Sequence, residues 1–197
     1  MKKIVLVVGL LCLVVSLWGQ EPIRFGRQSV YLEANVQPKT RSGQQTSSLE
    51  LGLPSGDRLN VLVQFSGALR HEALEKQGIK LHDYVGSNAY FATVKPGMRA
   101  SDFAGTGLRS ITAIKGEWKL ADELLSDRIP DYAQEGENVS LSLFWFPTVD
   151  WAWVKDYLTS RKIAFSSGSD VFHNVQISLP KDQIQLLAAE EWVQTVA

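Results

Sequence analysis

The feature that most constrains the fold of this chain is a repeated order of predicted elements. The pattern of apolar and polar residues predicts strand, helix, strand, strand, helix and strand, and later the same order again. Equivalent positions in the two copies, such as Leu74 and Leu158, lie about 84 residues apart. A repeated order with matched stop signals is stronger evidence than any single strand. We therefore predict two units of the same architecture, residues 58–116 and residues 138–197.

The patterns behind these elements are clear in the first copy. "RLNVLVQFSG" places Leu59, Val61 and Val63 on one face, which predicts a half-buried strand. "ALRHEALEKQGIK" predicts a short helix that ends at Gly78, because glycine commonly follows the last helical turn. "KLHDYV" and "AYFATV" predict two strands joined by a turn at residues 86–88. "RASDFAG" predicts a second short helix and "LRSITAI" the last strand.

The order β-α-β-β-α-β predicts an α+β fold made of two tandem ferredoxin-like units. Each unit would be an antiparallel four-stranded sheet with both helices on one face. The other face of each sheet is then left open. Such a face is either solvated, and therefore polar, or it is a docking surface.

In the second copy the predicted register places aromatic residues on this open face. The aromatic residues are Phe144, Phe146 and Trp192, and their polar neighbours are Ser140, Ser142 and Gln194. Fully burying one such ring is worth about 2–3 kcal/mol, so we expect something to cover them. Three explanations stay open: the first unit packs on the second, the register differs by one residue and inverts the faces, or a further domain binds there.

The N-terminus predicts export from the cell. Residues 1–20 begin with Lys2 and Lys3, continue with an apolar run over residues 4–15 and end in small or polar residues, as a cleaved signal peptide does. The apolar stretch is short for a membrane span of roughly 20 residues, and an uncleaved anchor is the alternative. We expect a secreted, cell-surface or periplasmic protein without membrane contact after cleavage. The single cysteine, Cys12, lies in this segment, so the mature chain would have neither disulfides nor thiolate ligands.

Two further segments are predicted to contribute little core. Residues 21–57 are polar and punctuated by Pro22, Pro38 and Pro54, with one strand-like piece, "QSVYLEANV", and we interpret them as a leader. Residues 117–137, "EWKLADELLSDRIPDYAQEGE", predict a charged linker with a helical turn.

Sequence patterns for catalysis or cofactor binding are missing. His71, His82 and His173 are the three histidines, and "HEALE" at His71 lacks the second histidine of a zinc-protease motif. The sequence has no Gly-x-Ser-x-Gly elbow, no phosphate-binding glycine loop and no EF-hand spacing. We therefore predict no catalytic residue, no metal and no cofactor, so that the chain itself is not an enzyme. The formal net charge of −1 argues against a nucleic-acid partner.

Three segments resemble the N-terminal prodomains of secreted bacterial subtilisin-like serine proteases (peptidase S8 family). They are "LNVLVQFSGALRHEALEKQGIKLHDYVGSNAYFATV", "KLADELLSDRIPDY" and "VQISLPKDQIQLLAAEEWVQTVA", and the likeness spans roughly residues 59–197. Prodomains of that family are ferredoxin-like, and some members carry two in tandem before the catalytic domain. Their open sheet face docks on surface helices of the protease, and the segment after the last strand lies in the active-site cleft.

The resemblance implies a propeptide that acts as intramolecular chaperone and temporary inhibitor. The implied partner is a subtilisin-like catalytic domain, in cis or in trans. The implied partner-binding residues are Phe144, Phe146 and Trp192 on the sheet, and Gln194, Val196 and Ala197 in the last strand. The catalytic Asp, His and Ser blocks are missing from this sequence, so the resemblance implies a role and not an activity; a full-length product that includes them would be the serine endopeptidase. We interpret the predicted strand at residues 192–196 as the point where the prodomain passes the chain to the protease.

The alternative is a free-standing secreted binding or adhesion module, or a stand-alone protease inhibitor. The coding sequence after Ala197 separates these hypotheses. An Asp-Thr-Gly-type block followed by His and Ser blocks favours the prodomain, whereas an immediate stop codon favours the alternative.

Overall fold

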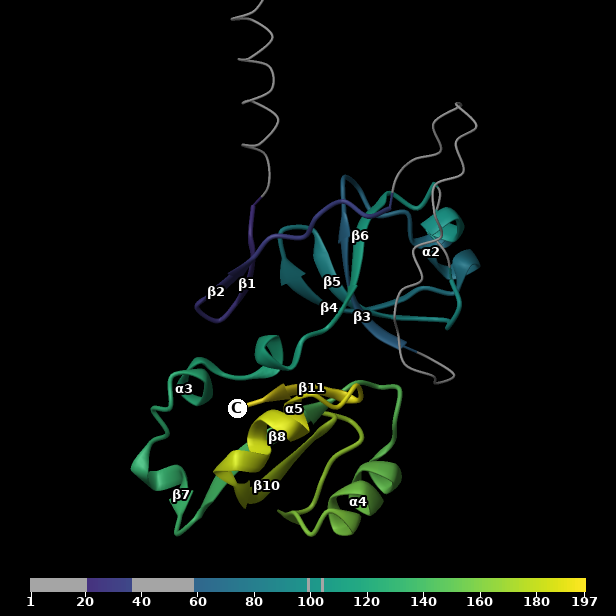
Figure 1. Cartoon of the computed structure of the whole chain (residues 1–197). Helices are drawn as coiled ribbons and strands as arrows, with labels where there is room; N and C mark the ends of the chain where they lie inside the picture. Colours follow the sequence, from purple (N-terminus) through teal and green to yellow (C-terminus); the bar gives the residue numbers. More distant parts are fainter. Residues whose placement is uncertain (1–20, 37–58, 99, 104) are drawn as a thin grey trace, which may run out of the picture.

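The computed structural model describes residues 21–36, 59–98, 100–103 and 105–197. These residues form an α+β structure with mostly antiparallel sheets and few helices, as the sequence predicts at this level. Figure 1 shows two sheets, one in the blue and teal part of the chain and one in the green and yellow part.

The first sheet contains four strands in the order β4-β5-β3-β6, with every neighbouring pair antiparallel. The strands are β3 (Leu59–Phe65), β4 (Lys80–Gly86), β5 (Ala89–Val94) and β6 (Leu108–Ala113). Helix α2 (His71–Gln77) packs on one face through Leu74. The second predicted helix is a single 3-10 turn, η1 (Ala100–Phe103), which contributes the buried Phe103 to the same core.

The turns of this unit lie where the sequence predicts them. Gly78 ends α2 in the left-handed region, at φ 75°, and its N–H donates to Glu75. The β4–β5 hairpin turns through Ser87 and Asn88, both with positive φ. Two central residues of positive φ match the right-handed twist of the flanking strands.

The second sheet has the order β11-β8-β10-β9, also antiparallel. The strands are β8 (Asn138–Trp145), β9 (Ala164–Phe165), β10 (Asn174–Pro180) and β11 (Val193–Val196), and the short β7 (Gln134–Glu135) pairs with the start of β8. If the strands of each unit are numbered one to four along the chain, both sheets have the same spatial order: fourth, first, third, second.

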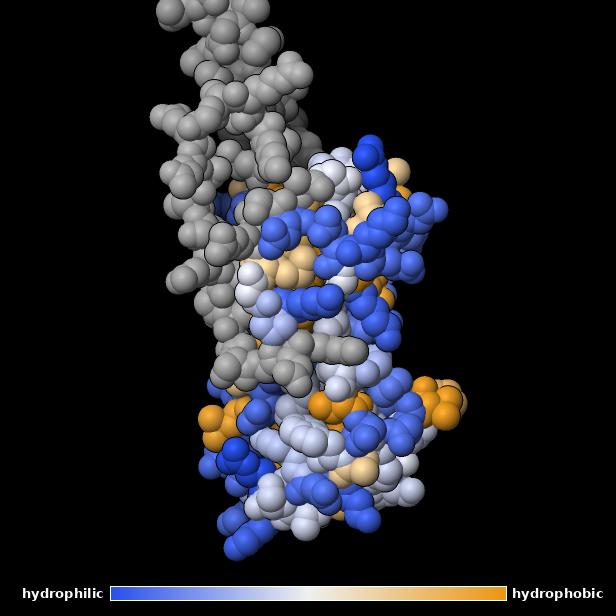
Figure 2. Space-filling model, turned by 90° about the vertical axis from the view of Figure 1, so that its right-hand side faces the viewer, coloured by the Kyte–Doolittle hydropathy of each residue, from blue (hydrophilic) through white to orange (hydrophobic). Residues whose placement is uncertain are grey.

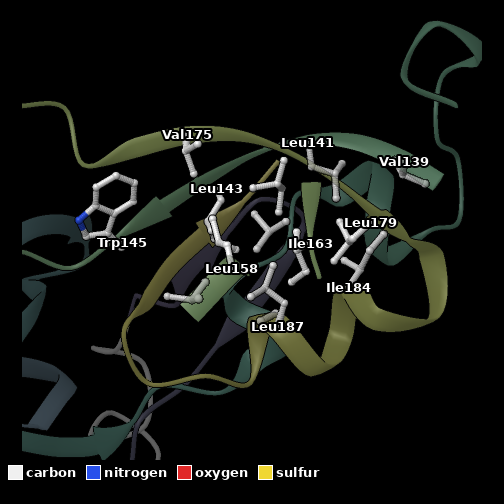
Figure 3. Close-up of a cluster of buried hydrophobic side chains, with 14 of the residues drawn as sticks. Val139, Leu141, Leu143, Trp145, Leu158, Ile163, Val175, Leu179, Ile184 and Leu187 are labelled. Carbon is white, nitrogen blue, oxygen red and sulfur yellow. The ribbon is translucent and has the colours of Figure 1, made fainter. Parts of the chain in front are cut away.

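Helices α4 (Trp151–Ser160) and α5 (Ile184–Ala188) cover one face of the second sheet. Asp150 caps α4 by accepting a hydrogen bond of 2.8 Å from the Trp153 N–H. Figure 3 shows side chains of β8, such as Leu141 and Leu143, pointing toward Leu158 and Leu187 of the helices. Burial along β8 alternates strictly, so its other face carries the half-exposed residues.

Residues 21–36, predicted from the sequence to belong to a polar leader with little core, contain a folded hairpin with buried side chains. Strands β1 (Ile23–Phe25) and β2 (Gln28–Val30) form a hairpin, and Ile23, Phe25 and Leu32 are buried. The remainder of the expected leader, residues 37–57, lies outside the described residues. The N-terminal segment therefore contributes core to the first unit rather than preceding it.

The expected charged linker also contributes buried side chains. It contains η2 (Gly116–Lys119), α3 (Asp122–Leu125) and η3 (Asp131–Ala133). Trp118 and Leu120 are buried, and Leu120 forms an isolated parallel β-bridge with Val196 of β11. Asp122 accepts a 2.8 Å hydrogen bond from the Arg27 N–H, which ties the hairpin to this connector.

A single aromatic cluster closes the open face of the first sheet. Its buried members are Ile23, Phe25, Leu32, Leu62, Ala89, Phe91, Trp118 and Phe146. Phe25 stacks on Trp118 with ring centroids 5.4 Å apart, and Phe91 meets Phe146 edge to face at 5.4 Å. The hairpin, the connector and the second unit thus share one core on this face.

We predict that Phe146→Ala lowers the free energy of unfolding by about 3 kcal/mol, because it removes a fully buried ring from this cluster. Urea denaturation followed by circular dichroism measures the change. In the Phe146→Ala variant we expect the two units to unfold in separate transitions. Phe172→Ala is the control, since Phe172 is 74% exposed and its loss should change stability by less than about 0.5 kcal/mol. A variant as stable as the wild type would show that the cluster does not couple the units.

Candidate functional site

The second sheet leaves the face opposite α4 and α5 uncovered within the described residues. Cross-strand pairing sets Ser140 opposite Ser178, and Ser142 opposite Gln176. Phe144, the next outward residue of β8, is partly exposed and belongs to none of the buried clusters. This surface therefore consists of polar side chains around one aromatic ring.

Hydrogen bonds hold the polar side chains of this face in place. The Gln176 amide donates to Ser142 Oγ at 2.7 Å, across the β8–β10 pair. Ser178 Oγ donates to the Glu135 carboxylate at 3.5 Å. Polar side chains that face water can also bond to it, so this face can stay exposed without unpaired polar groups.

Trp192 lies on the helix-covered side of the second sheet and not on the open face where the sequence pattern predicts it. Its ring centroid is 5.0 Å from that of Tyr157 and 5.4 Å from that of Trp153, both on α4. The residue precedes β11, and a bulge between Val193 and Thr195 disturbs the alternation there. The prediction that Trp192 faces away from the helices is therefore wrong.

Phe146 and Val196 are also fully buried within the chain. Phe146 follows the end of β8 and is covered by the first unit, which is one of the three explanations left open by the sequence. Val196 points into the core under α5. Neither side chain is open to a partner in this structure.

The other three predicted residues lie at or near the surface. Phe144 is on the open face, and Ala197 is exposed and exchanges two backbone hydrogen bonds with Ser142. The Gln194 amide donates to the Asp83 carboxylate of β4 and so joins the two units. A role in partner binding stays a prediction for Phe144, Gln194 and Ala197.

A polar network at the junction was not predicted. The Asn60 amide donates to Thr148 Oγ1 and to the Glu191 carbonyl, both at 3.1 Å. Thr93 Oγ1 donates to Asn60 Oδ1 at 3.1 Å, and His82 Nε2 lies 2.5 Å from the same hydroxyl. Thr148 and Glu191 lie about 90 residues or more from Asn60 in the sequence, so no local pattern predicts their contact with it. The one sequence signal was the polar side chain of Asn60 in a mostly apolar strand.

Two ionisable groups beside this network have shifted pKa values. Burial lowers the pKa of Lys119 to about 8, against the opposing charges of Glu191 and Glu190. Its ammonium donates to the Glu190 carbonyl at 2.6 Å. Burial, together with a hydrogen bond to Glu190, raises the pKa of Tyr157 to about 12. Both groups hold the 190–191 turn against the connector and α4.

Neither a metal centre nor a membrane span is found in the described part of the chain. No group of three or more His, Cys, Asp or Glu side chains there is arranged to hold a metal ion. None of its helices has the length and apolar character needed to cross a bilayer.

Comparison with known proteins gives one match. Residues 24–115, less than half of the chain, match a family described as a domain of unknown function (DUF8729). No curated protein and no solved structure matches. The matched segment begins in β1 and ends just after β6, so it contains both the hairpin and the first sheet.

We predict that acid weakens the junction through His82. Burial lowers its pKa, the Lys80 charge and, more weakly, His173 act in the same direction, and Asp83 opposes them. The unfolded chain therefore binds a proton more readily, and stability should fall as the pH drops below about 6.5, the ordinary pKa of histidine. Urea denaturation between pH 7.5 and pH 5 measures the change.

His82→Asn should flatten this pH dependence. His71→Asn, at an exposed position of α2, is the matched control and should leave it intact. Equal pH dependence in wild type and His82→Asn would contradict the assignment.

Proposed function

We propose that this chain is the prodomain region of a secreted subtilisin-like serine protease, built from two tandem ferredoxin-like units. In this proposal residues 1–20 are a cleaved signal peptide. The folded part binds the catalytic domain, assists its folding and inhibits it until the prodomain is degraded.

The tandem assignment is supported by the strand order that both sheets share. Each runs fourth, first, third, second, with all pairs antiparallel and the helical segments on one face. Two successive β-α-β units, the ferredoxin-like order, have this arrangement. The first unit departs from it in one respect, because η1 replaces a full second helix.

The observation that carries the proposal is the difference between the two open faces. The first is filled by the hairpin, Trp118 and Phe146, whereas the second is uncovered in the described structure. A partner can therefore dock on the second sheet without displacing any described part of this chain. Phe144 is suited to anchor such a contact, since interfaces commonly place an aromatic residue inside a polar rim.

The mechanism needs no chemistry from this chain. Subtilisin-type domains contain parallel pairings between distant segments, which form slowly because loop-closure entropy is lost before the contacts form. A sheet that is already folded can bind the partner's surface and stabilise it before the rest assembles. The same contact, kept after folding, leaves the protease inhibited.

The test is inhibition of mature bacterial subtilisin-like proteases by purified residues 21–197, measured with a chromogenic peptide substrate. We expect micromolar or tighter inhibition of at least one protease in a panel, and recovery of activity when that protease is refolded with the chain present. Phe144→Ala should raise the inhibition constant about 30-fold, because truncation of an interface anchor costs about 2 kcal/mol.

Leu186→Ala is the matched control. Leu186 is 71% exposed on α5, on the opposite side of the sheet, so its loss should not change inhibition. Absence of both inhibition and refolding assistance across the panel would overturn the proposal. Inhibition without refolding assistance would instead favour a stand-alone inhibitor.

A further inference from the structure

The loop between β9 and β10 presents two adjacent apolar side chains to solvent. Val171 is 81% exposed and Phe172 is 74% exposed. Single exposed apolar residues are common, but two neighbours on one turn form a distinct apolar tip. Leaving a ring such as Phe172 in water forgoes about 2 kcal/mol of burial. We call this pair the 171–172 tip.

The turn that carries the tip is held by several hydrogen bonds. Ser169 and Asn174 exchange backbone hydrogen bonds of 3.0 and 3.3 Å, and the Phe172 N–H donates to Ser169 Oγ. The Asp170 carboxylate accepts from the Trp151 N–H at 2.5 Å, at the start of α4. A tip fixed in this way loses little conformational entropy when it binds. Figure 2 shows hydrophobic surface on the second unit as small separate spots in a largely hydrophilic surface.

The first unit carries a pocket that suits such a tip. Its volume is about 690 Å³, and it lies between α2, β4 and β5. The apolar lining comes from Leu74, Ile79 and Val94, which are buried, and from Leu81 and Tyr90, which are partly exposed. Cavities of this size hold ligands larger than a valine and a phenylalanine side chain together.

We propose that the 171–172 tip of one copy binds in this pocket of a second copy of the chain. Charge supports this pairing: Asp170 adjoins the tip, and the exposed Lys80 and Lys95 line the pocket, with Glu75 as the one acidic lining residue. The tip does not fill the pocket of its own chain, because Phe172 is mostly exposed.

The positions of the tip and the pocket allow the exchange to be reciprocal. His173, next to the tip, packs edge to face on Trp145, and His82, which lines the pocket, lies against Phe146, the neighbour of Trp145. Both features therefore lie at the same junction between the units. Two copies related by a two-fold axis can each donate a tip and receive one. Each contact buries only two side chains, far less than the roughly 1,600 Å² of a standard interface, so association should depend strongly on concentration.

Sedimentation velocity of residues 21–197, a range that includes every described element, tests the proposal. The wild type should shift from monomer to dimer as its concentration rises. Phe172→Ser removes the tip and Leu81→Glu places a charge in the pocket, so each variant alone should stay monomeric. An equimolar mixture of the two variants should associate again, because it contains one intact tip and one intact pocket.

Leu186→Ser is the matched control, since it removes an equally exposed apolar side chain elsewhere and should leave association unchanged. Circular dichroism melts check that each variant is folded. A monomeric wild type at all concentrations, unchanged association of Phe172→Ser, or a folded mixture that stays monomeric would each overturn the proposal.

Discussion

The packing of four aromatic rings against the open face of the first sheet is the interaction on which the rest of the structure depends. Phe25, Phe91, Trp118 and Phe146 come from the hairpin, the sheet, the connector and the second unit. Without this cluster, four segments distant in sequence would have no shared core. Because this cluster covers the open face of the first sheet, the two units differ in the surface that they leave exposed. Among the described residues, the second sheet is the one whose open face is left for a partner to reach.

The junction also combines this apolar cluster with buried and partly buried polar groups. Asn60, Thr93 and His82 form one chain of hydrogen bonds toward the second unit, and Lys119 donates to the turn that follows α5. Hydrogen bonds in such a network require a single geometry, whereas apolar contacts tolerate several. At the junction, the aromatic cluster therefore provides the apolar burial, and the polar network adds contacts that favour one orientation of the units. Loss of either should affect the position of the open face more than the fold of each sheet.

Regular alternation and stop signals made much of the fold predictable. The alternation of β8, the helix stop at Gly78 and the turn at residues 86–88 all follow from local physical rules. Trp192 was placed on the wrong face because it lies just outside β11, where alternation no longer applies. For Phe146, local alternation could not decide between cover by the first unit and cover by another domain. The strand-like piece "QSVYLEANV" includes β2, but β1 was missed because it has only three residues and its core contacts outside the hairpin and Leu32 are more than 35 residues away. In the candidate site, the Phe144 side of β8 was predictable, while the Asp83–Gln194 contact depends on how the units dock.

A polar open face has a physical advantage for a temporary contact. Ser142 and Gln176 are polar and form a side-chain hydrogen bond, so this face can stay in contact with water without a cover. A partner that docks there must exchange some of these hydrogen bonds and water, so that affinity depends mainly on a central ring such as Phe144. An all-apolar face would bind more tightly, but it would also aggregate before the partner folded. A sheet of serine and glutamine around one phenylalanine is therefore compatible with the proposed prodomain role, in which the contact must form and later be released.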